Sequence, residues 1–185
     1  SGMLASLPWG RGTTGLGGSL AISAKFAPPE RVGIAMVGDC AMQMNGSNEM
    51  ITIAKYLRRW SNPHLIVMVL NNRDLNQVTW EQRAMEGDPK FEASQDVPDF
   101  PYAAYAELIG LRGLRVDQPE RLGNAWDYAI NADRPVVLEV YADPDVPPLP
   151  PHITFKQARA YASAILHGDP DSAGIIKQSV KQIFA

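Results

Sequence analysis

Two short apolar runs, each closed by polar residues, organise the first half of this chain. The run 32–37 ends just before Asp39, and the run 65–70 ends just before the asparagine pair 71–72. Continuous apolar runs of this length are typical of strands that are buried on both faces. Between them, residues 48–59 carry apolar side chains at a spacing that predicts one apolar stripe on a helix. The pattern therefore predicts a strand, a helix and a second strand.

This crossover has a consequence for the polar residues at the strand ends. Strands joined by a helical crossover run parallel, so we expect Asp39 and Asn72 to leave the same edge of one sheet, where ligands of open α/β sheets bind. A carboxylate, a carboxamide and nearby carbonyls are hard oxygen ligands, which suit Mg²⁺ or Ca²⁺ better than zinc. Because Mg²⁺ held by few protein oxygens usually also binds water and substrate phosphates, we expect a diphosphate ligand.

Alternating helical and strand patterns continue through the second half and complete an α/β prediction: a three-layer sandwich with a mostly parallel sheet. The remaining strands are expected at 114–116 and 136–140, and the remaining helices at 16–26, 102–109, 119–130, 154–167 and 175–184. Thr13 or Thr14 is the expected cap of the helix that begins at Leu16.

Two segments lack a sustained period. Residues 73–98 are predicted to be a long connection, anchored by Val78, Trp80 and Met85. Residues 143–151 form a proline-rich tract, which predicts a stiff spacer rather than a fold element.

Composition narrows the class of protein. The 185 residues fit one domain, 1–185, and the 45% hydrophobic and 20% charged residues are an ordinary globular balance. A net charge of -3 gives no reason to expect nucleic acid or an anionic membrane as partner. No apolar stretch approaches the roughly 18 residues that span a bilayer. The single cysteine excludes an intrachain disulfide, and the expected location is cytoplasmic.

The polar residues that follow the two apolar runs resemble a known sequence motif. Residues 38–40 (GDC), followed by Asn71-Asn72 and then Asp74, resemble the diphosphate-binding motif of thiamine diphosphate enzymes. The stretches 42–49 (MQMNGSNE) and 70–75 (LNNRDL) place the chain nearest the pyruvate oxidase and acetolactate synthase branch. The resemblance covers essentially the whole chain and implies a thiamine diphosphate-binding fold.

The resemblance also implies the binding residues. Mg²⁺ would be bound by the side chains of Asp39 and Asn72 and by the carbonyl of Asp74. The carbonyl of Ala5 would accept a hydrogen bond from the 4′-amino group of the cofactor, and Leu7 would support its bent shape. The full cofactor-binding set is Ala5, Leu7, Gly38, Asp39, Cys40, Ala41, Asn72 and Asp74, and no catalytic residue is expected in this chain.

Two departures from the family pattern stand out. Cys40 occupies a position that is most often glycine, and Asp39 lies 33 positions before Asn72, several more than is common in the family. A small side chain fits the first position, and a longer segment on the far side of the crossover need not move either ligand. We therefore expect binding to survive both departures.

For function, the resemblance implies a thiamine diphosphate- and Mg²⁺-dependent enzyme that decarboxylates a 2-oxo acid such as pyruvate, with transfer or oxidation of the two-carbon unit. A pyrimidine-binding domain of the same or another subunit would complete the active site, residues 73–98 would fold over the cofactor, and FAD is allowed in the full-length protein. The chain is expected to be an inactive piece of a longer polypeptide that self-associates, at least as a dimer, through its early loop and Trp80.

Three alternatives remain open. The chain could be a natively separate subunit of a split thiamine enzyme. It could also be a non-catalytic Mg²⁺- or phosphate-binding α/β module, or a receiver-like module in which Asp39 accepts a phosphoryl group.

Overall fold

The structure is a computed structural model that describes residues 14–27, 30–146 and 154–183. The chain divides into two compact units. Unit 1 comprises Ser1–Asn71 and Asp99–Ala142, and unit 2 comprises Asn72–Pro98 and Asp143–Ala185. The expectation of a single domain over 1–185 stays a prediction.

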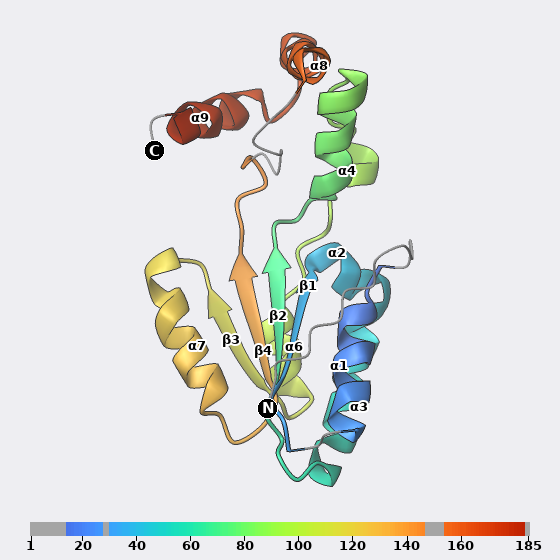
Figure 1. Cartoon of the computed structure of the whole chain (residues 1–185), viewed down its shortest axis with the longest axis vertical. Helices are drawn as coiled ribbons and strands as arrows, with labels where there is room; N and C mark the ends of the chain where they lie inside the picture. The colour runs from blue at the N-terminus through green and yellow to red at the C-terminus, as the bar shows by residue number, and fades with distance from the viewer. Residues whose placement is uncertain (1–13, 28–29, 147–153, 184–185) are drawn as a thin grey trace. The chain divides into compact units, whose positions relative to one another are not determined.

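Unit 1 is built on a parallel sheet of four strands in the order β1-β2-β4-β3 (Figure 1). The strands are β1 (Gly33–Gly38), β2 (Leu65–Asn71), β3 (Arg112–Val116) and β4 (Val136–Tyr141). β1 pairs with β2 in a register that places Gly38 beside Leu70, so the two strands end next to each other. The predicted α/β fold with a parallel sheet is confirmed, and each strand lies within two residues of its predicted bounds.

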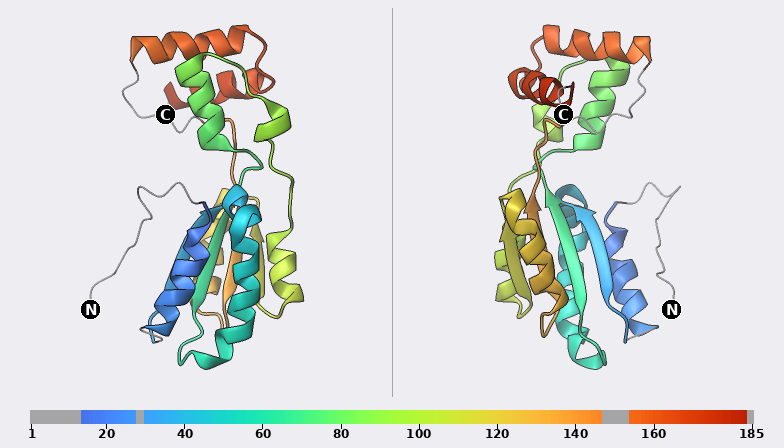
Figure 2. Two further views of the ribbon diagram at one scale, coloured as in Figure 1. Left: turned by 90° about the vertical axis from the view of Figure 1, so that its right-hand side faces the viewer. Right: turned by 60° about the vertical axis from the view of Figure 1, so that its left-hand side comes forward.

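Helices cover both faces of this sheet (Figure 2). On one face α1 (Leu16–Phe26), α3 (Ser47–Tyr56) and α6 (Tyr102–Leu108) share a core with Leu65, Val67 and Val69 of β2. On the other face α7 (Leu122–Ile130) packs over Ile66, Met68 and Leu138. Burial from both sides explains why the sequence of β2 is a continuous apolar run rather than an alternating one.

The second face is covered only in part. Ile34 and Met36 of β1 point to the same side as Ile66 and Met68, yet they are 53% and 63% exposed. The described part of unit 1 therefore leaves apolar surface open over its edge strand.

The helix after β1 begins earlier than its sequence pattern predicts. α2 (Asp39–Ala41) starts directly at the strand end and continues through the π-helical turn η1 (Met42–Gly46) into α3, which the 3-10 turn η2 (Leu57–Arg59) extends. A second 3-10 turn, η4 (Pro119–Arg121), leads into α7 in the same way. The predicted helix 48–59 thus finishes with a 3-10 turn, and the predicted helix 119–130 starts with one.

The start of α1 corrects a prediction. Its N-cap residue is Gly15, with φ 92° and no side-chain cap, so the expected cap by Thr14 is wrong, and Thr13 lies outside the described residues. A Cβ at Gly15 would lie 2.8 Å from the carbonyl oxygen of Ala41. Close approach and a left-handed backbone, rather than capping chemistry, therefore determine this helix start.

Unit 2 is helical. It contains α4 (Asn76–Glu81), the π-helical turn η3 (Gln82–Glu86), α5 (Glu92–Gln95), α8 (Phe155–Leu166) and α9 (Ser172–Ile183). The two C-terminal helices were predicted, and Thr154 and Gln157 form a capping box at the start of α8. The sequence predicted no helix within the long connection 73–98, yet residues 76–86 and 92–95 of it are helical.

The expected anchors of this segment are also corrected. Val78 and Met85 are 49% and 59% exposed, whereas Trp80 is 1% exposed. The Trp80 ring packs against Tyr161, with ring centroids 5.8 Å apart, and its indole N–H donates to the carbonyl of Pro144 at 3.4 Å. Trp80 is therefore not the uncovered surface through which self-association was expected, and the early loop lies outside the described residues.

Candidate functional site

The end of β1 carries Asp39 in a constrained turn. Asp39 is the first residue of α2 and is 3% exposed. Its Oδ1 accepts the N–H of Cys40 at 2.8 Å, and its backbone carbonyl accepts the hydroxyl of Tyr102 at 3.0 Å. Tyr102 is fully buried and also accepts a hydrogen bond from Gln43 Nε2 at 3.2 Å; burial, the largest cause, raises its pKa to about 12. The neutral tyrosine therefore fixes the strand-to-helix turn from α6.

The residues next to Asp39 in the chain have different surroundings. Among the described residues, no atom beyond the chain neighbours lies within 4 Å of a Cβ built at Gly38, so their packing does not require glycine there. Ala41 is buried in the core. Burial, followed by the charge of Asp39, raises the pKa of the half-buried Cys40 thiol. Cys40 is therefore a neutral small side chain at this turn rather than a thiolate.

At the end of β2, Asn71 bridges two carboxylates inside unit 1. It is 1% exposed, and its Nδ2 donates to Glu139 Oε1 at 3.0 Å and to Asp99 Oδ1 at 3.2 Å. Glu139 also accepts the N–H of Ala103 at the start of α6 at 3.0 Å, and Asp99 accepts the hydroxyl of Tyr141 at 3.2 Å. Asn71 thus ties the end of β2 to β4 and to the segment before α6.

Sequence reasoning missed this bridge, although one signal was present. Glu139 is the only charged residue in the apolar run 136–140 and is 1% exposed. A carboxylate in a strand buried on both faces needs donors. The side chain of Asn71 and the N-terminus of α6 supply them.

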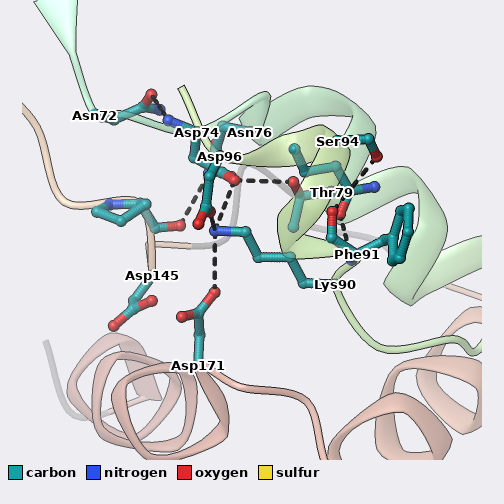
Figure 3. A network of polar contacts seen from close by, with 12 residues as sticks. Asn72, Asp74, Asn76, Thr79, Lys90, Phe91, Ser94, Asp96, Asp145 and Asp171 are labelled. Carbon is teal, nitrogen blue, oxygen red and sulfur yellow. Dashed lines mark hydrogen bonds and ion pairs between the residues drawn. The ribbon is translucent and has the colours of Figure 1, made fainter. Parts of the chain in front are cut away.

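Asn72 and Asp74 belong to unit 2, where they form one turn (Figure 3). Asn72 Oδ1 accepts the N–H of Asp74 at 3.1 Å across Arg73, whose φ of 58° is left-handed. This is the geometry of an Asx turn. Asp74 is 4% exposed, and its Oδ1 accepts the Thr79 hydroxyl at 3.1 Å and Lys90 Nζ at 2.9 Å. Its carboxylate is therefore engaged within the unit, which favours the carbonyl for any metal contact.

Lys90 is surrounded by carboxylates. Its side chain is 8% exposed, and Nζ lies 2.7 Å from Asp96, 2.9 Å from Asp74 and 3.6 Å from Asp171. Burial by itself would lower the pKa of Lys90, but the hydrogen bonds to Asp96 and Asp74 raise it above its usual value. Lys90 is thus a permanently charged centre of this network.

A second cation lies nearby in the same unit. Arg83 makes a two-pronged contact with Asp169 at 2.7 and 2.8 Å, and both side chains are at most 1% exposed. Arg83 also contacts Asp171 at 2.8 Å and lies over the Trp80 ring at 4.9 Å. Burial alone would raise the pKa of Asp169, but hydrogen bonds from Arg83 and backbone amides hold it below its usual value.

The predicted site residues are therefore placed in three groups. Gly38, Asp39, Cys40 and Ala41 lie at the end of β1 in unit 1, and Asn72 and Asp74 lie in unit 2. Ala5 and Leu7 fall outside the described residues. The joint site of Asp39, Asn72 and Asp74 stays a prediction, because each unit is placed only by itself.

The described residues contain neither a cluster of metal-binding side chains nor a membrane-spanning helix. In residues 14–27, 30–146 and 154–183, no cluster of three or more His, Cys, Asp or Glu side chains is arranged to hold a metal ion. The predicted set is of another kind, with one carboxylate, one carboxamide and one carbonyl. Within the same ranges, no helix has both the length and the apolar character needed to cross a membrane.

Known proteins resemble this chain along most of its length. YdaP of Bacillus subtilis (strain 168), named as a thiamine pyrophosphate-containing protein, is 32% identical over 176 residues, which cover 93% of this chain and 29% of YdaP. The mitochondrial acetolactate synthase catalytic subunit of Aspergillus candidus is 34% identical over 141 residues, covering 76% of this chain and 19% of that subunit. The chain thus spans less than a third of the length of these relatives.

A solved structure and a family model also connect this chain with thiamine diphosphate enzymes. The thiamine diphosphate-dependent 4-hydroxybenzoylformate decarboxylase of Rhodococcus jostii RHA1 has a TM-score of 0.60 and 25% identity, covering 70% of this chain and 23% of that chain. Residues 3–140 match the family model of the thiamine pyrophosphate enzyme C-terminal TPP binding domain. Since that match takes in most of the chain and includes all four strands but for the last residue of β4, the chain belongs to the thiamine pyrophosphate enzymes and carries their C-terminal TPP-binding domain.

Proposed function

We propose that this chain anchors the diphosphate of thiamine diphosphate through Mg²⁺. The observation that carries the proposal is the register of β1 and β2, in which Gly38 and Leu70 are partners. Asp39 follows the first of these residues directly, and the asparagine pair 71–72 follows the second. Parallel strands that end together deliver polar side chains to one sheet edge, where ligands of open α/β sheets bind.

The residues at the strand ends fit such a ligand. Asp39 supplies one charged oxygen ligand, Asn72 a carboxamide oxygen and Asp74 a backbone carbonyl, which leaves positions on Mg²⁺ for diphosphate oxygens and water. Within the described ranges, a Cβ at Gly38 would have no close neighbour, which suits close approach by a ligand to the backbone. Cys40 and Ala41, small and next in the chain, continue this surface. Asn71, by contrast, is engaged with Glu139 and Asp99, which supports Asn72 as the ligand of the pair.

The chemistry at this edge divides between cofactor and protein. Thiamine diphosphate, when bound, supplies the stabilisation of carbanions. Asp39 would neutralise part of the metal charge and fix the diphosphate end. Tyr102 would hold the Asp39 turn rigid through the carbonyl that it already contacts at 3.0 Å. A rigid anchor of this kind positions the cofactor without taking part in proton transfer.

We further propose that the full-length protein acts on a 2-oxo acid such as pyruvate, releasing carbon dioxide and transferring or oxidising the two-carbon unit. Support comes from relatives named as acetolactate synthases and as a 4-hydroxybenzoylformate decarboxylase. A pyrimidine-binding domain, outside this chain, would complete the active site, with Ala5 and Leu7 beneath the cofactor. A homo-oligomer, a cytoplasmic location and a flavin in the full-length protein belong to the same proposal.

Carbon dioxide release by the full-length protein tests the proposal. Pyruvate and 4-hydroxybenzoylformate would be supplied in turn, with thiamine diphosphate and Mg²⁺ present or omitted, and with and without an electron acceptor. We expect release from at least one acid only when both cofactors are present. Cofactor binding without consumption of any 2-oxo acid would instead indicate a non-catalytic binding module.

A further inference from the structure

The turn that carries Asn72 and Asp74 is held by Lys90. Lys90 Nζ contacts the carboxylate of Asp74 at 2.9 Å, and the same ammonium contacts Asp96 at 2.7 Å (Figure 3). The backbones of the same two aspartates are also paired, because Asp74 and Asp96 form an isolated antiparallel β-bridge. A cation that joins both sides of the bridge fixes the direction of the turn.

Hydrogen bonds on either side of Asp74 strengthen the same bridge. The N–H of Leu75 donates to the carbonyl of Gln95 at 2.8 Å, and the N–H of Val97 donates to the carbonyl of Arg73 at 2.9 Å. These bonds do not by themselves fix the Asp74 side chain, whose hydrogen bonds and ion pair in the described part of the chain come from Thr79, Asn76 and Lys90. Lys90 brings the only positive charge among these contacts.

The C-terminal segment supports Lys90 in turn. Asp171 lies 3.6 Å from Lys90 Nζ, and Asp169 Oδ2 accepts the backbone N–H of Lys90 at 2.8 Å. Asp169 is at the same time paired with the buried Arg83. The two aspartates between α8 and α9 therefore bind the side chain and the backbone of the residue that fixes Asp74.

These aspartates lie beyond the part of the chain that the family model matches, which ends at residue 140. The alignment with YdaP, however, covers 93% of the chain. An alignment that long must include Asp169 and Asp171 wherever it begins. The C-terminal segment is thus shared with this relative.

We propose that Lys90 is a positioning residue for the Asn72–Asp74 turn, and that Asp171 and Asp169 complete its support. The C-terminal segment would then take part in anchoring the cofactor through these contacts. The inference rests on the proposed function, in which Asn72 and Asp74 are ligands of Mg²⁺. It adds to that function a second layer of contacts, which orients ligands that are otherwise carried by a short turn.

Cofactor affinity in four variants tests the proposal, measured calorimetrically in the full-length protein over a range of Mg²⁺ concentrations. Lys90→Met keeps the length of the side chain and removes its charge, and Lys90→Arg restores the charge. Asp171→Asn weakens the support from the C-terminal segment. Lys156→Met is the matched control, because it makes the same substitution on an exposed face of α8 in the same unit.

Lys90→Met should weaken Mg²⁺-dependent binding of thiamine diphosphate by about 10–100-fold and raise the Mg²⁺ concentration needed for half-saturation. Lys90→Arg should recover most of this loss, Asp171→Asn should lose less than Lys90→Met, and Lys156→Met should bind like the unmodified protein. A purely structural role would lower the unfolding temperature of Lys90→Met without changing affinity in the folded protein, and that result overturns the proposal.

Hydrogen exchange over residues 72–98 shows whether unit 2 of each variant is folded. If Lys90→Met unfolds it, Asp171→Asn decides, because this side chain is 30% exposed and its neutralisation leaves Lys90 paired with Asp74 and Asp96, and Arg83 paired with Asp169. Unchanged affinity in a folded Asp171→Asn would then overturn the proposal. Failure of the unmodified protein to bind thiamine diphosphate with Mg²⁺ would overturn the proposed function as well, so the two failures are distinguishable.

Discussion

The two units of this chain are stabilised by different chemistry. Unit 1 has an apolar core on each face of a parallel sheet, filled by β2, β4 and the helices that cover them. Unit 2 encloses, beside Trp80, the buried cations Arg83 and Lys90 and the carboxylates of Asp74 and Asp169. Apolar burial tolerates substitutions of similar volume, whereas a buried charge depends on its partner. Breaking the buried Arg83–Asp169 pair should therefore damage unit 2 far more than breaking the exposed Arg134–Asp133 pair damages unit 1.

Replacing Arg83 with Met should cause the largest loss of stability that this comparison predicts. Asp169 would remain buried without its partner, and breaking a buried pair in this way costs about 3–5 kcal/mol of unfolding free energy. Hydrogen exchange of peptides from residues 72–98 and 154–183 should report the loss, while peptides from β2 and β4 should keep their protection.

The matched control is Arg134→Met. Arg134 also contacts an aspartate, Asp133, at 3.1 Å, but both side chains are exposed. Its removal should leave protection unchanged in both units. Equal effects of the two arginine substitutions would show that burial does not distinguish the two pairs.

The neighbouring asparagines offer a finer comparison. Asn71→Ala removes the donor that the buried Glu139 shares with the exposed Asp99, which should cost about 1–3 kcal/mol of stability in unit 1. Asn72→Ala removes a proposed Mg²⁺ ligand and should cost far more cofactor affinity than Asn71→Ala, with little loss of stability. Thermal unfolding and calorimetric titration of both variants separate the two roles. A larger loss of affinity in a folded Asn71→Ala variant would mean that the assignment is off by one residue.

Lowering the pH should destabilise unit 2 less than the substitutions above. Because the folded-state pKa of Asp169 lies below its unfolded value, this group stabilises unit 2 above the unfolded pKa of about 3.9, and the contribution is lost as pH falls through the lower folded value. Hydrogen exchange during acidification below about pH 4 should therefore detect opening of unit 2 before unit 1. Loss of protection in unit 1 first would contradict this order.

The same contrast explains what the sequence could predict. The strands of unit 1 were found within two residues because apolar runs such as 65–70 report burial directly. The helices at 76–86 and 92–95 were missed because the buried face of the first carries Thr79 and Arg83 beside Trp80, so no apolar stripe marks it. Polar residues are buried there only because Asp74 and Asp169, one of them far along the chain, pair with them.

The candidate site was also predictable only in part: the positions of its residues followed from the sequence, but their side-chain partners did not. Asp39 and the asparagine pair stand at strand ends, where the pattern itself points to a ligand. The engagement of Asn71 with Glu139 and Asp99, and of Asp74 with Lys90, depends on partners brought together only by folding. The end of β1 was clear enough to place Asp39, but the cap at Gly15 was not, since a left-handed start depends on the approach of Ala41.

Calorimetric titration of the full-length protein with thiamine diphosphate, with and without Mg²⁺, tests the central claim most directly. The unmodified protein should bind the cofactor only when Mg²⁺ is present. Asp39→Ala should abolish this binding, because it removes the one charged side chain of the proposed ligand set, while the apolar cores on both faces of the sheet should keep the variant folded. Normal cofactor affinity in a folded Asp39→Ala variant would contradict the account.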